Sequence, residues 1–258
     1  MNDLNNLNSS FYIEQPLTQV TAYDKAGKTS LAVSLTIDAL IHCGKKVLYF
    51  SPGKESTRDI RYRMVAAWRA YTLTDMGSIL ENPTDIRHKF AQDSLLATFK
   101  LPLIIRDETE PTFQQFRKWY LWHAHYDKID LIIVDDFHCI KEGGKMEYLH
   151  ELQKLANTFQ IPCLVFNPLP TTSNRDSRRL SRLNIRLGAC AHLGMWLSRP
   201  LYEINAELEI IKSIGYTRSS PPEQRVLLSF NPRTGHFEDV ENIGMHLTLS
   251  GMYQECSF

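Results

Sequence analysis

Short apolar runs alternate with longer amphipathic stretches along the first two thirds of the chain. The apolar runs predict strands at 17–23, 46–51, 101–106, 130–135 and 163–167. Between them, apolar positions recur with the period of about 3.6 residues that indicates an α-helix. This pattern predicts helices at 29–43, 58–71, 75–98, 112–126 and 146–159, the third of them interrupted at Asn82-Pro83. Such alternation is typical of a parallel sheet covered by helices on both faces.

The last third of the chain is richer in strands. Strands are predicted at 192–198, 208–215, 225–231 and 236–240. The segment 231–235 (NPRTG) is a hairpin-type turn, so antiparallel strands are expected to extend the sheet at its C-terminal end. The predicted fold class is therefore α/β, with a mainly parallel central sheet flanked by helices. We expect one domain at 11–245, between a disordered tail at 1–10 and a C-terminal tail at 246–258.

Composition excludes some classes of protein. Basic and acidic residues number 29 each, so no overall charge draws the chain to nucleic acid or to lipid, and such binding needs a local patch. The five cysteines include no C-x-x-C pair, which favours reduced thiols. The polar N-terminus lacks the pattern of a signal peptide, and no apolar stretch reaches the roughly 18 residues of a membrane span. These features predict a cytoplasmic protein.

A candidate phosphate-binding loop, AYDKAGKTS at 22–30, lies between the first strand and the first helix. It matches the P-loop pattern G-x-x-x-x-G-K-[ST], except that Ala22 replaces the first glycine. Backbone N–H groups at the helix start would bind phosphate, Lys28 would reach the β- and γ-phosphates, and Thr29 would bind Mg²⁺. The predicted nucleotide contacts in the loop are Ala26, Gly27, Lys28, Thr29 and Ser30. The alternative is a chance Gly-Lys-Thr at a helix start.

Asp135 is the expected partner of this loop. It ends the apolar strand DLIIVD, as a Mg²⁺-linked aspartate does in P-loop proteins. Asp136 would point to the opposite side of the strand, which makes Asp135 the better candidate. The alternative is that Asp135 only caps the following turn.

The order of these motifs resembles the C-terminal ATPase domain of DnaB-type replicative helicases. The stretches that carry the resemblance are 22–30, 45–51 (KKVLYFS), 131–137 (LIIVDDF), 147–167 and 209–230. That family also tends to have alanine at the first position of the loop. The resemblance implies a RecA-like P-loop NTPase fold, binding of ATP and Mg²⁺ with Thr29 and Asp135 as metal ligands, and single-stranded DNA as a partner. It also implies a homo-oligomer or an association with another replication ATPase.

The chain departs from the family where hydrolysis takes place. The family's water-activating glutamate falls at Gly53, and Glu55 is the candidate substitute, or else a solvated residue at a helix start. The family's γ-phosphate-sensing glutamine falls at Pro168. Its finger lysine falls at Tyr216, whereas its finger arginine is present as Arg218. The candidate catalytic residues are thus Glu55 and Arg218, and we predict nucleotide binding with weak or lost hydrolysis.

A basic segment lies where RecA-like helicases place a DNA-contacting loop. Its cations are Arg175, Arg178, Arg179, Arg182 and Arg186. Arginines there would bind the phosphates of single-stranded DNA without reading its sequence. The alternatives are a solvated basic helix and a protein-docking surface, and no aromatic residue for base stacking lies inside the segment.

Three functions remain open from the sequence. The first is an ATP-binding, DnaB-helicase-like protein that acts on or near DNA. The second is a non-catalytic adaptor that docks onto another protein or a ring ATPase. A small-molecule kinase is the third and is disfavoured, because no arginine-rich lid fits between the loop and Asp135. A ring would favour the first function and a monomer or dimer the second.

Overall fold

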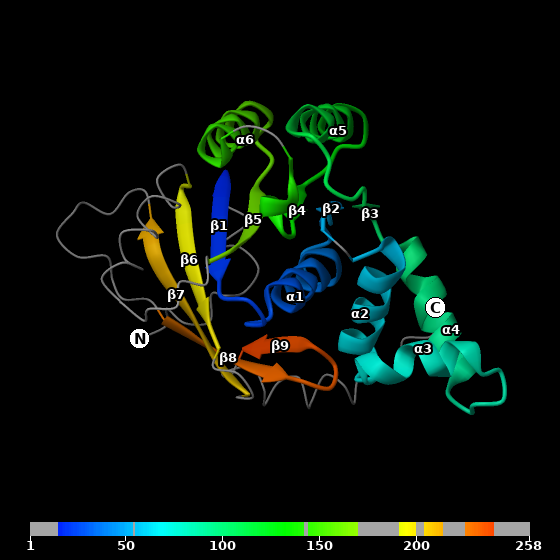
Figure 1. The fold of residues 1–258 in the computed structure, drawn as a ribbon. Helices are drawn as coiled ribbons and strands as arrows, with labels where there is room; N and C mark the ends of the chain where they lie inside the picture. The colour runs from blue at the N-terminus through cyan, green and yellow to red at the C-terminus, as the bar shows by residue number, and fades with distance from the viewer. Residues whose placement is uncertain are drawn as a thin grey trace.

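One nine-stranded sheet organises the chain (Figure 1). The computed structural model describes residues 15–53, 55–141, 144–169, 191–199, 204–213 and 225–239. The strand order is β3-β2-β4-β5-β1-β6-β7-β8-β9. The strands are β1 Leu17–Ala22, β2 Val47–Phe50, β3 Leu103–Arg106, β4 Leu131–Val134, β5 Cys163–Pro168, β6 Leu193–Ser198, β7 Asn205–Ser213, β8 Arg225–Asn231 and β9 His236–Asp239.

The sheet is parallel from β3 to β6 and antiparallel beyond it. The apolar runs therefore predicted the strands and the change of pairing. Strand β6, the first strand of the last third, still pairs parallel with β1. The antiparallel extension therefore begins at β7.

Helices cover both faces of the sheet (Figure 1). They are α1 Lys28–Ile41, α2 Thr57–Arg69, α3 Leu73–Glu81, α4 His88–Lys100, α5 Phe113–Tyr126 and α6 Lys145–Phe159, with a short 3-10 helix η1 at Phe137–Cys139. Helices α1 and α2 lie on one face, and α5 and α6 lie on the other (Figure 1). Capping boxes at Ser56 and Thr112 fix where α2 and α5 begin. The predicted break at Asn82-Pro83 is confirmed, because α3 ends at Glu81.

Two hydrophobic cores lie on the two sides of the sheet. On β4, Ile133 packs into the core that contains Val33 of α1, whereas Ile132 packs into the core that contains Phe116 of α5 and Leu152 of α6. Alternate residues of a strand are thus buried on opposite faces, which explains the continuous apolar runs in the sequence. No helix in the described part of the chain is both long and apolar enough to cross a membrane.

The parallel topology brings distant segments together at one edge. Strands β1, β4 and β5 are neighbours and run in the same direction, so the loop after β1 and the residue after β4 emerge at the same edge. This carboxyl edge is where open α/β sheets bind ligands. The fold therefore places the predicted phosphate loop and Asp135 at one site.

Candidate nucleotide-binding site

The loop between β1 and α1 has the backbone shape of an anion site. Gly27 has φ 103°, in the left-handed region, and stands at the N-terminus of α1. No side chain caps this helix end, so its first N–H groups face the loop. Uncapped N–H groups and the positive end of the helix dipole favour a phosphate.

Lys28 already folds over the loop. Its side chain is nearly buried, with Nζ 3.6 Å from Oδ1 of Asp24 and 3.5 Å from the carbonyl oxygen of Tyr23. Asp24 is 65% exposed. The ammonium group is therefore held beside the loop by an exchangeable partner that a phosphate would replace.

Replacing Asp24 by asparagine is expected to tighten binding of Mg-ATP about threefold to tenfold. The change removes a carboxylate that repels the triphosphate and competes with it for Lys28. The affinity for a fluorescent ATP analogue measures this, with Asp93→Asn on the exposed face of α4 as the matched control. Weaker binding in Asp24→Asn would show that the carboxylate helps to hold the nucleotide.

The hairpin of β8 and β9 packs directly on the loop. A Cβ atom on Gly27 would lie 2.9 Å from Cε2 of Phe237 and 3.9 Å from Cε2 of Phe230. The two phenylalanine rings contact each other, with centroids 4.8 Å apart. Ser34 of α1 anchors the hairpin, because its Oγ accepts the N–H of Phe237 at 3.0 Å. Glycine is thus needed at position 27 for space as well as for its φ angle.

Arg199, just after β6, also forms hydrogen bonds with the loop. Its Nε donates to the carbonyl oxygen of Ala26 at 3.1 Å, and its Nη2 donates to that of Lys25 at 2.8 Å. Its guanidinium group lies 4.2 Å from the ring centroid of Phe230. Partial burial lowers the pKa of Arg199. The carbonyl groups of the loop are therefore turned toward Arg199 and away from the phosphate side.

Asp135 is buried at the end of β4, with 2% of its surface exposed. Its Oδ2 accepts the hydroxyl of Tyr49 at 3.1 Å, whereas the buried Oδ1 has no partner at hydrogen-bond distance among the described residues. Burial and the charge of Asp136 raise the pKa of Asp135 to about 7, although the nearby hydroxyl groups of Thr29 and Tyr49 lower it. A buried oxygen without a partner beside the Thr29 hydroxyl fits a hard cation such as Mg²⁺.

The described residues form no larger cluster of metal ligands around Thr29 and Asp135. Among the residues that the structure describes, no group of three or more histidine, cysteine, aspartate or glutamate side chains converges on one point. Mg²⁺ at nucleotide sites typically takes one or two protein ligands together with phosphate oxygens and water. Thr29 and Asp135 match such a site.

Asp136 lies close to Gly53, the position where the resemblance places a catalytic glutamate. It has φ 61° and so leaves the alternation of the strand. Its Oδ2 lies 3.3 Å from where a Cβ atom on Gly53 would be. Because β4 ends at Val134, strand alternation does not set the direction of the Asp136 side chain. A longer side chain at position 53 would meet the carboxylate of Asp136.

Glu55, the candidate substitute, is bound to Arg63 of α2. Oε1 and Oε2 of Glu55 accept from Nη2 and Nε of Arg63 at 2.6 and 3.1 Å. The charge of Glu55 also contributes to the raised pKa of Tyr49 and of Asp135. The structure thus brings Glu55 to the side of the sheet where Asp135 lies, but with both oxygens paired.

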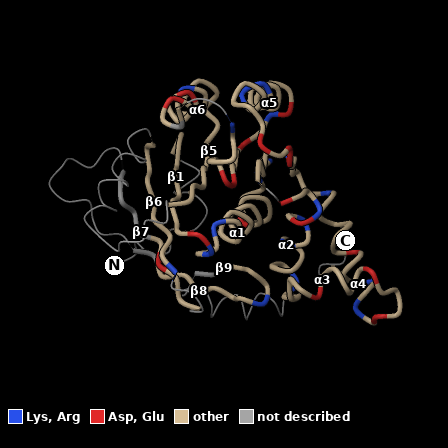
Figure 2. Tube along the Cα trace, viewed as in Figure 1, with Lys and Arg blue, Asp and Glu red and all other residues tan. Residues whose placement is uncertain are grey.

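Of the remaining positions considered for catalysis and DNA binding, Pro168 lies in the described part of the chain and the others do not. Pro168 ends β5 beside Ala22, so its ring stands next to the loop and offers no polar group. Arg218 lies outside the described residues. The basic set Arg175, Arg178, Arg179, Arg182 and Arg186 lies outside them as well. In the described part, both signs of charge occur on the outer helices α5 and α6 (Figure 2).

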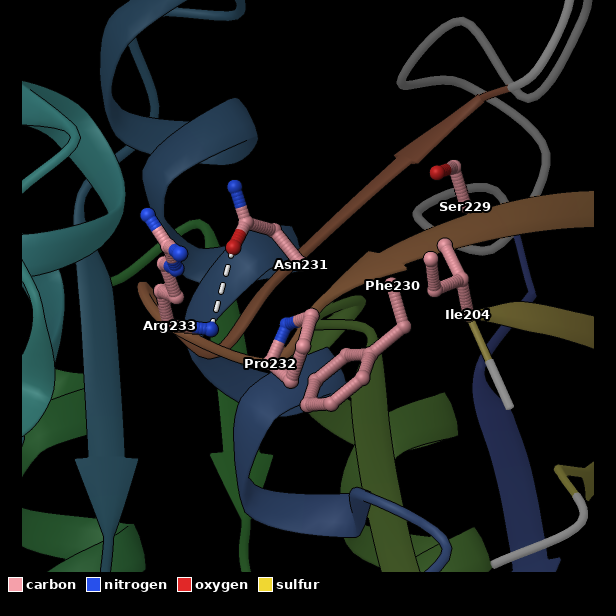
Figure 3. Close-up of a pocket in the computed structure, with 6 residues that line it drawn as sticks. All are labelled: Ile204, Ser229, Phe230, Asn231, Pro232 and Arg233. Atoms are coloured by element: carbon pink, nitrogen blue, oxygen red, sulfur yellow. Dashed lines mark hydrogen bonds between the residues drawn. The ribbon is translucent and has the colours of Figure 1, made fainter. Parts of the chain in front are cut away.

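A cavity of about 360 Å³ lies at the β8–β9 hairpin next to the loop. Its lining is Ile204, Ser229, Phe230, Asn231, Pro232 and Arg233. Figure 3 shows the Phe230 ring beside Pro232, and the bond from the backbone N–H of Arg233 to Oδ1 of Asn231, 3.0 Å, that closes the turn. Phe230 thus lines this cavity and also lies close to Gly27 and Arg199.

Comparisons with known proteins agree with this architecture. No family model matches the sequence, and no curated protein matches it. A structure solved as a separate ATPase domain matches with a TM-score of 0.71 and 14% identity, over 88% of this chain and 85% of that chain. A DnaB-like replicative helicase, solved in a study of its interactions with primase, matches with a TM-score of 0.72 and 14% identity, over 87% of this chain and 57% of that chain. The chain has the fold of a DnaB-like helicase ATPase domain.

The DnaB-like ATPase fold confirms the fold class predicted from the sequence. Sequence reasoning missed three residues of the site, namely Tyr49, Arg199 and Phe237. The only local signal for Arg199 is a cation that directly follows an apolar strand at the carboxyl edge. Tyr49 and Phe237 give no such signal, because an apolar strand accepts an aromatic residue at any inward position.

Proposed function

We propose that the chain binds a nucleoside triphosphate, ATP, together with Mg²⁺ at the loop 22–30. The observation that carries this proposal is the buried Oδ1 of Asp135, which has no hydrogen-bond partner among the described residues. It belongs to a residue whose carboxylate also interacts with Thr29, at the start of an uncapped helix. A buried oxygen of this kind costs about 1–3 kcal/mol unless it gains a partner, which a bound cation supplies.

Each part of the site has a role in this proposal. The N–H groups at the start of α1 and Lys28 bind the phosphates, and Thr29 and Asp135 hold the metal. A bound Mg²⁺ would neutralise part of the phosphate charge. The cavity beside Phe230 takes the base or the ribose, since its 360 Å³ lies at the lower end of the range for small-molecule sites.

Hydrolysis is weak or lost in this proposal. A general base must lie within hydrogen-bond reach of the attacking water. Gly53 has no side chain, and both oxygens of Glu55 are engaged by Arg63. Glu55 acts as the base only when that ion pair opens. Pro168, at the position of the expected γ-phosphate sensor, offers no polar side chain.

The proposed setting is the cytoplasm, on or near DNA during replication. Support comes from the fold and from the basic residues at 175–186, which suit single-stranded DNA phosphates. In a homo-oligomer, Arg218 would complete the nucleotide site of a neighbouring copy. A ring would place these residues around the bound strand.

A non-catalytic adaptor is the second candidate. The observation that favours it is the absence of the expected catalytic groups at positions 53 and 168 although the nine-stranded sheet is present. Nucleotide is then a structural ligand that stabilises the site, and the protein docks onto a ring ATPase or another partner. A complex that forms equally well without nucleotide supports the adaptor.

ATP turnover with and without single-stranded DNA separates these proposals. We expect turnover well below about 1 s⁻¹, a modest value among enzymes. Stimulation by DNA supports the helicase-like function, and its absence supports the adaptor. Turnover at or above about 1 s⁻¹ that disappears in Lys28→Ala would refute weak hydrolysis.

A further inference from the structure

The outer side of α5 carries a groove that takes no part in the nucleotide site. Its volume is about 670 Å³, and its lining includes Leu121, Trp122 and Tyr126 of α5 and Phe159 of α6. Trp122 is 55% exposed and Tyr126 is 64% exposed, with ring centroids 4.5 Å apart. Aromatic surface gathered in this way is usually covered by a partner.

The rim of the groove is basic. Arg117 and Lys118 line it one turn before Trp122, and no carboxylate is among the described residues that line it. Glu151 accepts only from Nε of Arg117, at 3.2 Å. The amino groups of Arg117 and the ammonium group of Lys118 thus remain at the rim. Charge complementarity favours an apolar occupant that carries acidic residues.

The N-terminal segment enters the fold next to β5, four residues along the chain from the groove residue Phe159. The carbonyl oxygen of Pro16 accepts the N–H of Cys163 at 2.9 Å, and Leu17 pairs with Cys163 in the parallel ladder. Phe159 is four residues before Cys163, so it lies within about 18 Å of Leu17. Phe11 is six residues before Leu17, and an extended chain of that length reaches about 20 Å.

The sequence of residues 1–14, MNDLNNLNSSFYIE, suits the groove in charge and spacing. Its charged side chains are Asp3 and Glu14, and it contains no lysine or arginine. Leu4, Leu7 and Phe11 stand at i, i+3 and i+7, the spacing of one helix face. Composition alone predicts a disordered tail, but such a segment can fold when it binds an apolar surface.

We propose that residues 1–14 fold back as a strap on their own chain and lay Leu4, Leu7 and Phe11 into the groove against Trp122 and Phe159. The length is suitable, because eleven helical residues span about 16 Å and the face of α5 from Gln114 to Tyr126 spans about 18 Å. Asp3, next to Leu4 in the strap, meets the basic rim. This inference does not depend on nucleotide binding.

A labelled peptide tests the strap. The probe is a fluorescein-labelled peptide of residues 1–14, and fluorescence anisotropy measures its binding to the full chain and to a chain that starts at Glu14. We expect the shortened chain to bind the peptide at least about tenfold more tightly, because a tethered segment competes at an effective concentration of about 1 mM. Trp122→Ala and Lys118→Glu in the shortened chain should each weaken binding at least about fivefold.

The same assay includes matched control variants and gives the results that would contradict the strap. Phe90→Ala and Lys89→Glu alter an exposed aromatic residue and a cation on α4, and both should leave binding unchanged. If the shortened chain fails to fold, the full chain with Leu7→Ser and Phe11→Ser replaces it, since both changes free the groove. Equal binding to both chains, or no binding to the shortened one, would overturn the strap.

Two other occupants would also overturn the strap. A second copy would appear as a dimer of the full chain in sedimentation, which Trp122→Ala dissociates. Nucleic acid would appear as displacement of the peptide by an oligothymidylate strand, with a steep dependence on salt. A monomeric full chain and a peptide that the strand does not displace support the strap.

Discussion

Replacing Asp135 by asparagine is expected to stabilise the nucleotide-free protein at pH 8 and to remove its response to Mg²⁺. The pKa of Asp135 is about 7 in the fold and near 3.8 in an unfolded chain. Between these values the unfolded chain ionises while the fold retains the proton, so this group lowers stability as the pH rises from about 4 to about 7. Above pH 7 the full penalty applies, about 4 kcal/mol.

Asparagine cannot ionise, so it removes that penalty but leaves an amide at a site built for a cation. We expect a net gain of about 2 kcal/mol at pH 8, or about 4 °C in melting temperature, and no gain at pH 4. Melting curves over this pH range, with and without ATP and Mg²⁺, measure both effects. Asp93→Asn, on the exposed face of α4, is the control. A gain that does not vary with pH would refute the account of Asp135.

Replacing Gly27 by alanine is expected to destabilise the protein by about 2–4 kcal/mol and to abolish nucleotide binding. Part of the loss is backbone strain, since alanine at φ 103° costs roughly 1–2 kcal/mol. The rest arises because the new Cβ would lie 2.9 Å from the Phe237 ring and push the β8–β9 hairpin off the loop. The displaced loop no longer aims its N–H groups at a phosphate.

Gly44→Ala separates the two costs of Gly27→Ala. Gly44 also has a positive φ, 60°, but a Cβ there meets nothing within 4 Å. We expect this control to lose only about 1 kcal/mol in urea denaturation and to bind nucleotide normally. Equal losses for the two variants would show that the contact with Phe237 carries no weight.

Local pattern was enough to predict the fold and the residues that it brings together at the candidate site. Val134 and its apolar neighbours predicted a buried strand. A carboxylate at the end of such a strand indicates a functional site more often than a purely structural role. Lys28 was found because loop, glycine and helix start are contiguous in sequence. These features depend on neighbours within a few residues, which a single sequence records.

Long-range contacts could not be predicted in this way. Arg199 reaches Ala26 across 173 positions of sequence, and Phe237 meets Ser34 across 203. The ion pair between Glu55 and Arg63 spans a loop and a helix start, so no fixed spacing indicates it. The position of Asp136 depends on one left-handed residue. Each of these contacts changes the chemistry that is expected at the candidate site.

Titration calorimetry with ATP and Mg²⁺ tests the central claim most directly. We predict measurable binding to the natural chain and to Lys25→Ala, whose side chain is exposed in the same loop, and binding at least about 100-fold weaker in Lys28→Ala. A folded natural chain that binds no Mg-ATP, or Lys28→Ala that binds as tightly as the natural chain, would contradict a phosphate site at this loop.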